Sequence, residues 1–173
     1  VSGTYRTADP NAASGDLKYA YFYGDGNCGP NNWWRCDTIT QISDGPPFSG
    51  EGPHISLADN LSPAIAYYDG LEHSLTIARY LGDVTGNCGP YNTWRCDPTD
   101  EFWGYDDQMG VSLGLDSAGR PVIAYSQWSG SSQYLKTAQE AGRLGLPNGN
   151  CGPGQTWQCT YEMGALRALD AHL

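Results

Sequence analysis

The chain has 173 residues, enough for one ordinary domain with a hydrophobic core. Charged residues make up only 16% of it, and it contains 23 Gly, 12 Tyr and 6 Trp, a composition typical of a turn-rich β protein rather than a helical one. The net charge of −10 speaks against nucleic acid and anionic membranes as partners, because both require a basic surface. No segment approaches the roughly 18 apolar residues of a membrane span. We therefore expect no nucleic-acid partner and no membrane insertion.

Four kinds of short run, here called A to D, follow one another along the chain, each bounded by Gly, Pro, Asn or Asp as strands usually are. Each D run begins with Trp-x-Cys and follows a Gly-Asn-Cys-Gly-Pro motif. The cysteines of this motif, Cys28, Cys88 and Cys151, are separated by 60 and then 63 residues. In chain order the runs are B at 1–5, C at 17–20, D from 34, A at 55–59, B at 63–67, C at 75–78, D from 94, A at 109–116, B at 121–125, C at 135–138, D from 157 and A at 163–170.

These runs predict strands in meander order. In residues 75–80, a period of two places Leu75, Ile77 and Arg79 on one face of a strand and Thr76, Ala78 and Tyr80 on the other. Residues 116–120 read as the hairpin turn between an A run and a B run. Four strands in each unit of about 60 residues indicate propeller blades. The rival folds are a β-trefoil and a β-prism, which also have threefold pseudo-symmetry.

The repeated motifs carry a resemblance to a known family. The string LDSAGRPVIAY at 115–125, followed by YLKTA, GNCGP and Trp-x-Cys, resembles the blade repeats of secreted bacterial β-propellers. The resemblance covers nearly the whole chain and implies an all-β protein of three four-stranded, propeller-blade-like repeats. It carries little about function, because propellers host unrelated activities.

The six cysteines form three pairs with seven residues between the partners. Zinc sites prefer two to four intervening residues and dithiol redox sites prefer two, so the spacing favours a local disulfide in each repeat. The predicted pairs are Cys28–Cys36, Cys88–Cys96 and Cys151–Cys159. Disulfides form in oxidising compartments, so we expect a secreted, extracellular or cell-surface protein. The sequence predicts no metal site and no cofactor.

The order of the runs places a break inside one blade. The chain is interpreted as one repeat domain, 1–173, with a split unit (1–45 plus 163–173), a second unit (46–103) and a third unit (104–162). An A run and a B-C-D sheet that lack each other both leave unpaired edges, which proteins usually cover. A ring of three blades within one chain lies below the usual range of four to eight, so we expect chains to complete each other's sheets, as a closed six-bladed dimer or a head-to-tail filament. The residues expected at this interface are Val1, Gly3, Tyr5, Met163, Ala165, Leu166, Ala168 and Leu169.

A lectin is the first alternative. Trp34, Trp94 and Trp157 lie two residues before the second cysteine of each pair, where they either pack over the disulfide or offer platforms for sugars. Three or six equal sites would suit multivalent glycan binding. Asn60 opens an Asn-x-Ser glycosylation sequon in the turn between an A run and a B run.

A glycan-processing hydrolase is the second alternative. Its paired carboxylates would come from Asp97, Asp100, Glu101, Asp106 and Asp107. The three histidines, His54, His73 and His172, recur in no other unit and no nucleophile motif accompanies them, so a catalytic triad is not indicated. The leading hypothesis is therefore a non-enzymatic structural or adhesive protein whose partner is itself.

Overall fold

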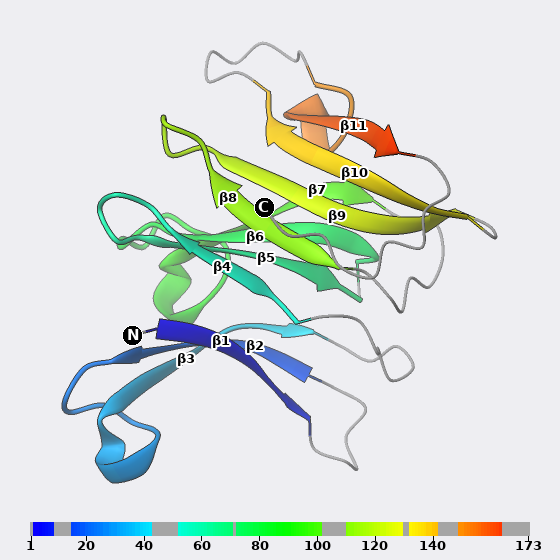
Figure 1. The fold of residues 1–173 in the computed structure, drawn as a ribbon. Helices are drawn as coiled ribbons and strands as arrows, with labels where there is room; N and C mark the ends of the chain where they lie inside the picture. The colour runs from blue at the N-terminus through cyan, green and yellow to red at the C-terminus, as the bar shows by residue number, and fades with distance from the viewer. Residues whose placement is uncertain are drawn as a thin grey trace.

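The computed structural model describes residues 2–8, 15–42, 52–70, 72–101, 110–129, 132–141 and 149–163. Within these ranges the chain forms eleven β-strands in three separate antiparallel sheets, and no α-helix (Figure 1). The described part also has no helix that is long and apolar enough to cross a membrane. The expectation of an all-β protein is confirmed.

Each sheet is a meander of strands that follow one another in the chain. Sheet 1 consists of β1 (Ser2–Ala8), β2 (Gly15–Phe22) and β3 (Trp34–Ile42). Sheet 2 consists of β4 (His54–Leu57), β5 (Pro63–Asp69), β6 (Ser74–Tyr80) and β7 (Trp94–Glu101). Sheet 3 consists of β8 (Val111–Leu115), β9 (Pro121–Ser129), β10 (Ser132–Glu140) and β11 (Trp157–Met163). Short 3-10 turns at Pro30–Asn32, Pro90–Asn92 and Pro153–Gln155 precede the last strand of each sheet.

The predicted turn between β8 and β9 is present. The Asp116 carboxylate accepts hydrogen bonds from the backbone N–H groups of Ala118 (2.8 Å) and Arg120 (2.9 Å), and Leu115 pairs with Pro121 on the two strands. Asp at the first position of a turn stabilises it in this way, because its carboxylate accepts hydrogen bonds from backbone N–H groups of the turn.

Every sheet also bends at the same place. The pairing between its last two strands shifts by one residue immediately after a leucine, at Leu17, Leu75 and Leu135. A β-bulge of this kind increases the local twist of the sheet.

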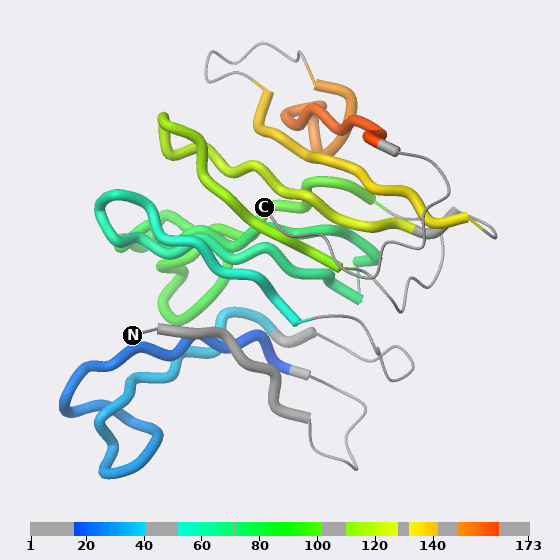
Figure 2. Tube along the Cα trace, viewed as in Figure 1, coloured from blue at the N-terminus to red at the C-terminus, as the bar shows by residue number. Residues whose placement is uncertain are grey.

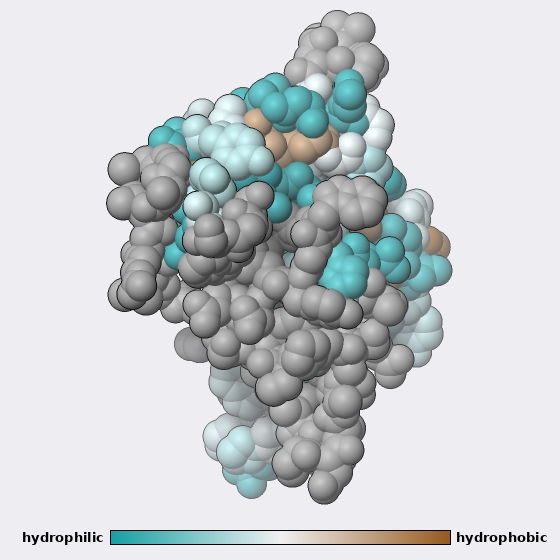
Figure 3. All heavy atoms as spheres, turned by 90° about the vertical axis from the view of Figure 1, so that its right-hand side faces the viewer, coloured by the Kyte–Doolittle hydropathy of each residue, from teal (hydrophilic) through white to brown (hydrophobic). Residues whose placement is uncertain are grey.

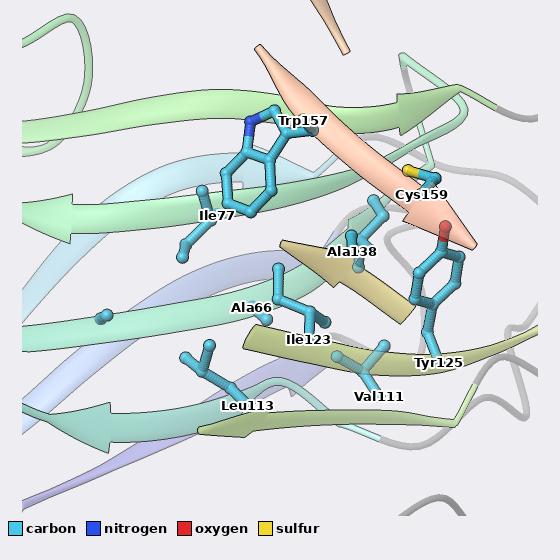
Figure 4. Packing of buried hydrophobic residues seen from close by; sticks show 11 residues of the cluster. Ala66, Ile77, Val111, Leu113, Ile123, Tyr125, Ala138, Trp157 and Cys159 are labelled. Carbon is cyan, nitrogen blue, oxygen red and sulfur yellow. The ribbon is translucent and has the colours of Figure 1, made fainter. Parts of the chain in front are cut away.

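Each sheet has two different faces, which we call the Trp face and the Leu face. The Trp face carries Trp34, Trp94 or Trp157, and the Leu face carries Leu17, Leu75 or Leu135. The Leu face of sheet 1 packs on the Trp face of sheet 2, where Leu17 and Ile39 join Trp94 in one core. The Leu face of sheet 2 packs in the same way on sheet 3, where Leu75 and Ile77 join Trp157 in one core. Figure 4 shows Ile77 beside the ring of Trp157.

The three sheets form an open stack and not a closed ring. Sheets 1 and 3 lie at opposite ends of the stack, with sheet 2 between them (Figures 1 and 2). The split unit is expected to hold only B, C and D runs at 1–45, and sheet 1 has three strands among the described residues. Its β1 pairs with β2 alone, so no described segment supplies a fourth strand.

The end of β11 also differs from expectation. Met163, expected to begin an A run, instead ends β11, where it pairs with Leu135 beyond the bulge. The remaining interface residues of that run, Ala165, Leu166, Ala168 and Leu169, lie outside the described residues, as does Val1. Gly3 and Tyr5 lie in β1, opposite Ala20 and Lys18.

Candidate assembly surface and inter-sheet clefts

Strand β1, at the edge of sheet 1, lies at the same place in the stack as β4 of sheet 2 and β8 of sheet 3. Strand β4 lies beside β8, and β1 lies beside β4 (Figure 1). In sheets 2 and 3 this inner position belongs to an A strand, whereas in sheet 1 it belongs to a B strand. Sheet 1 therefore resembles its neighbours with the innermost strand missing from the described residues.

The three tryptophans proposed as sugar platforms are not equivalent. Trp94 and Trp157 are only 1% and 2% exposed, because the preceding sheet covers them. Two of the three predicted platforms are therefore closed to a ligand, and their role is to pack against the neighbouring sheet. Trp34 is half-buried on the outer side of sheet 1, with the ring of Phe22 5.9 Å away and 55% exposed.

The disulfide loops share one construction, and all three predicted disulfides are confirmed as Cys28–Cys36, Cys88–Cys96 and Cys151–Cys159. In the second loop, the side chain of Asn87 accepts a hydrogen bond from Cys96 N (2.7 Å) and donates one to Cys96 O (2.9 Å). Asn27 and Asn150 make the same two contacts in their own loops. The Gly-Asn-Cys motif thus clamps the start of each last strand.

The second loop also ties two sheets together. The backbone N–H of Gly89 donates a 2.8 Å hydrogen bond to the carbonyl of Ile39 in sheet 1. Gly89 has φ +73 and lies close to the Trp94 side chain, so only glycine fits there without strain.

A cleft of about 380 Å³ opens between sheets 1 and 2, and we call it the aromatic cleft. It is lined by Tyr19, Tyr21, Arg35 and Asp37 of sheet 1, by Tyr80 and Trp94 of sheet 2, by Pro90, Tyr91 and Thr93 of the turn before β7, and by residues 60–63. Tyr19 meets Trp94 edge-on with ring centroids 5.4 Å apart, and Tyr80 meets it at 5.3 Å. Burial and the nearby Asp37 carboxylate raise the pKa of Tyr21 above its usual value, so its hydroxyl keeps its proton at neutral pH.

A second cleft of about 320 Å³ lies at the corresponding place between sheets 2 and 3, and we call it the charged cleft. Arg79 spans it, donating to Glu140 at 2.8 Å and to Asp97 at 3.1 Å. Burial lowers the pKa of Arg79, but the bonds and charges of Glu140 and Asp97 outweigh it and raise that pKa overall.

A buried polar cluster joins sheets 2 and 3, and sequence reasoning did not find it. Lys136 Nζ is paired with the Asp100 carboxylate, which also accepts a 2.6 Å hydrogen bond from the Tyr125 hydroxyl. The three residues are 5%, 8% and 0% exposed. No periodicity or spacing signals this cluster, because its members come from three strands that meet only in the folded chain.

The carboxylates proposed for hydrolysis are placed as structural groups where the structure describes them. Asp97 is held by Arg79 and Arg95, and Asp100 by Lys136. Glu101 ends β7 and is exposed, while Asp106 and Asp107 lie outside the described residues. Asp100 lies near Cys151 and Cys159, but both sulfurs are used in a disulfide and so are not available to a metal.

The described histidines also have structural contacts. His54 Nδ1 accepts a 3.1 Å hydrogen bond from the backbone of Leu113, linking sheets 2 and 3. His73 lies 3.2 Å from the Tyr68 hydroxyl in the turn before β6. His172 lies outside the described residues.

Comparison with known proteins gives no relative. No family model, no curated protein and no solved structure matches the chain.

Proposed function

We propose that this protein is a secreted, non-enzymatic structural or adhesive protein that assembles with copies of itself by completing a β-sheet between chains. The observation that carries the proposal is the strand count of sheet 1, which among the described residues has three strands where sheets 2 and 3 have four. An unpaired edge exposes a row of backbone donors and acceptors, which is a template for another strand. Three disulfides support an oxidising, extracellular setting.

The connections between sheets indicate which segment would be the donor. Strand β3 of sheet 1 leads to β4, the innermost strand of sheet 2, and β7 leads in the same way to β8 of sheet 3. From the end of β11 onward the sequence resembles that around β8, since 163–170 and 109–116 both begin with Met-Gly and end with Leu-Asp. By the same connection this segment would become the first strand of a next sheet, and sheet 1 of a second copy has no such strand in the part of the chain that the structure describes.

The faces of the end sheets support the same partner. Inside the stack, a Leu face always covers the next Trp face, and this leaves Trp94 and Trp157 almost fully buried. The Trp face of sheet 1 has no described sheet over it, and Phe22 remains 55% exposed there. Burying a large apolar side chain contributes about 1.5–3 kcal/mol, so a sheet of another copy that covers Phe22 and Trp34 would be stabilised by this contact.

Such an interface joins two different surfaces, head to tail. It closes as a ring of two chains if the rotation between copies allows, and otherwise continues as a filament. Both products use the same donor segment and the same edge of β1. The proposal therefore predicts self-association in either case.

Deleting residues 164–173 tests this proposal, because it removes the donor and leaves the pairing of Met163 with Leu135 intact. We expect the full chain to form dimers or longer polymers by light scattering and negative-stain microscopy, and the deleted chain to be a folded monomer. A synthetic peptide of residues 163–173 should bind the deleted chain, since it supplies the strand in trans.

Two substitutions provide a matched comparison. Trp34→Lys places a charge on the outer Trp face and should weaken association, whereas Val84→Lys, at a position 73% exposed in a turn, should not. A full chain that remains monomeric, or a deleted chain with an unchanged assembly state, would contradict the proposal.

A further inference from the structure

We propose that the aromatic cleft between sheets 1 and 2 is a binding site for an uncharged carbohydrate. This site uses none of the three tryptophans as an exposed platform and does not depend on self-assembly, because a single chain forms both walls. Its volume of about 380 Å³ falls within the range of small-ligand pockets, which combine aromatic walls with a few polar groups.

The charged cleft shows which residues occupy the equivalent positions between sheets 2 and 3, and so it can be compared with the aromatic cleft. Strand register makes the two clefts comparable: Tyr21 pairs with Arg35 as Arg79 pairs with Arg95, and Tyr80 pairs with Trp94 as Glu140 pairs with Trp157. Arg79 thus corresponds to Tyr21, and Glu140 corresponds to Tyr80. In the charged cleft, Arg79 and Glu140 form an ion pair with each other. The fold therefore holds two sheets together here with an ion pair that spans the space.

In the aromatic cleft the same two positions hold Tyr21 and Tyr80, and rings replace the ion pair. Tyr80 is 40% exposed even though its ring packs on Trp94. Exposed aromatic surface is unfavourable in water, so a row of rings facing an open cleft is better explained by a ligand that covers it than by sheet packing.

Tyr91, which lines this cleft, gives an independent indication. It has φ 56 and ψ 23, a left-handed conformation that is costly for a bulky side chain, and its side chain is 83% exposed. The corresponding positions in the other two loops hold Asn31 and Gly154, which tolerate this backbone. A strained, solvent-exposed tyrosine contributes little to folding, and such strain is typical of functional positions.

The polar groups of the cleft define the ligand class. Arg35 Nε donates to Asp37 at 3.4 Å on one wall, so one cationic and one anionic group lie side by side. A cationic ligand would meet Arg35, an anionic ligand would meet Asp37, and the chain as a whole has a net charge of −10. These features favour an uncharged ligand.

The remaining chemistry favours a sugar among uncharged ligands. A pyranose has an apolar C–H face that stacks on an aromatic ring and hydroxyls around its edge that both donate and accept hydrogen bonds. The rings of Tyr21, Tyr80 and Tyr91 would contact the face. The guanidinium of Arg35 and the carboxylate of Asp37 would bond the hydroxyls as donor and acceptor.

Ligand-observed NMR on protein made without N-glycosylation tests the proposal. The probes are the methyl glycosides of glucose, galactose, mannose and N-acetylglucosamine, with sialic acid and tetramethylammonium as charged comparisons. We expect saturation transfer to at least one neutral glycoside and none to the charged probes. Transfer to no neutral glycoside, or to a charged probe alone, would overturn the proposal.

The variant Tyr91→Gly separates binding from folding, because the third loop already has Gly154 in the same conformation. We expect Y91G to keep its melting temperature and to bind at least about tenfold more weakly, a loss of roughly 1.4 kcal/mol. Arg35→Gln should weaken binding as well, because it removes the guanidinium that would donate to the ligand hydroxyls. The third repeat has Gln158 at this position, so we expect the variant to fold. Asn31→Gly is the matched control at the same loop position outside the cleft, and unchanged binding in Y91G would contradict the assignment.

Discussion

The Tyr125 hydroxyl donates a 2.6 Å hydrogen bond to the Asp100 carboxylate across the boundary between sheets 3 and 2. The same carboxylate is paired with Lys136, so three buried polar groups satisfy one another where the sheets meet. Such a cluster adds little net stability when complete, but losing one member leaves a buried charge without its partner.

Lys136→Met should therefore destabilise the protein by about 3–5 kcal/mol, because Asp100 would be left buried and uncompensated. Urea unfolding followed by tryptophan fluorescence measures the change. Lys18→Met is the matched control, since Lys18 holds the same position in sheet 1 but makes only a half-exposed contact with Asp16 at 3.6 Å. We expect that control to change stability by less than about 1 kcal/mol, and equal effects of the two variants would argue against the buried pair.

The buried tyrosines predict a loss of stability at high pH. Burial, reinforced by the Asp69 charge, raises the pKa of Tyr67, and burial with the Asp100 charge and hydrogen bond raises that of Tyr125. The unfolded chain then releases these protons at about pH 10, before the folded chain does, so their stabilising effect is complete below that pH and is lost as pH rises above it. Tyr67→Phe should flatten the fall of the unfolding free energy above about pH 10, as measured by urea unfolding at several pH values.

A tyrosine absorbance titration gives the complementary result. Tyr67 and Tyr125 should ionise only as the protein unfolds. Ionisation of all tyrosines in one early step, with the near-UV circular dichroism unchanged, would contradict the burial of the two hydroxyls.

The glycine that opens each disulfide motif should not tolerate a side chain. A Cβ on Gly86 would lie 1.9 Å from the carbonyl oxygen of Trp94, which is backbone and cannot move aside. Gly86→Ala should cost about 3 kcal/mol or more in thermal or urea unfolding. Gly52→Ala, where no heavy atom lies within 4 Å of the added carbon, should stay within about 0.5 kcal/mol of the parent protein.

The disulfides should differ in importance although their loops are equal in length. Closing a loop of this size stabilises the folded state by roughly 2.5 kcal/mol in the chain-entropy description. Cys88–Cys96 also packs against the core between sheets 1 and 2, whereas Cys28–Cys36 lies on the outer face of sheet 1. Replacing Cys88 and Cys96 by Ser should therefore lower the melting temperature more than replacing Cys28 and Cys36.

Much of the fold could be predicted because its signals are local and repeated. The Cys-x7-Cys spacing identified all three disulfides, and turn residues such as those at 116–120 marked the hairpins. The candidate site was less accessible to sequence reasoning. The tryptophan at the head of each last strand looks the same in every repeat, but Trp94 and Trp157 are buried by a neighbouring sheet that sequence periodicity does not reveal.

The sequence by itself determined the local structure of this protein, because the signals for its strands, hairpin turns and disulfide loops lie in short consecutive runs of residues. Only the tertiary structure decided what lies between the sheets. Tyr21 and Tyr80 meet in one cleft and Arg79 and Glu140 in another because stacking brings together faces about 60 residues apart in the chain. Contacts of that kind depend on which face covers which, and no local pattern encodes this.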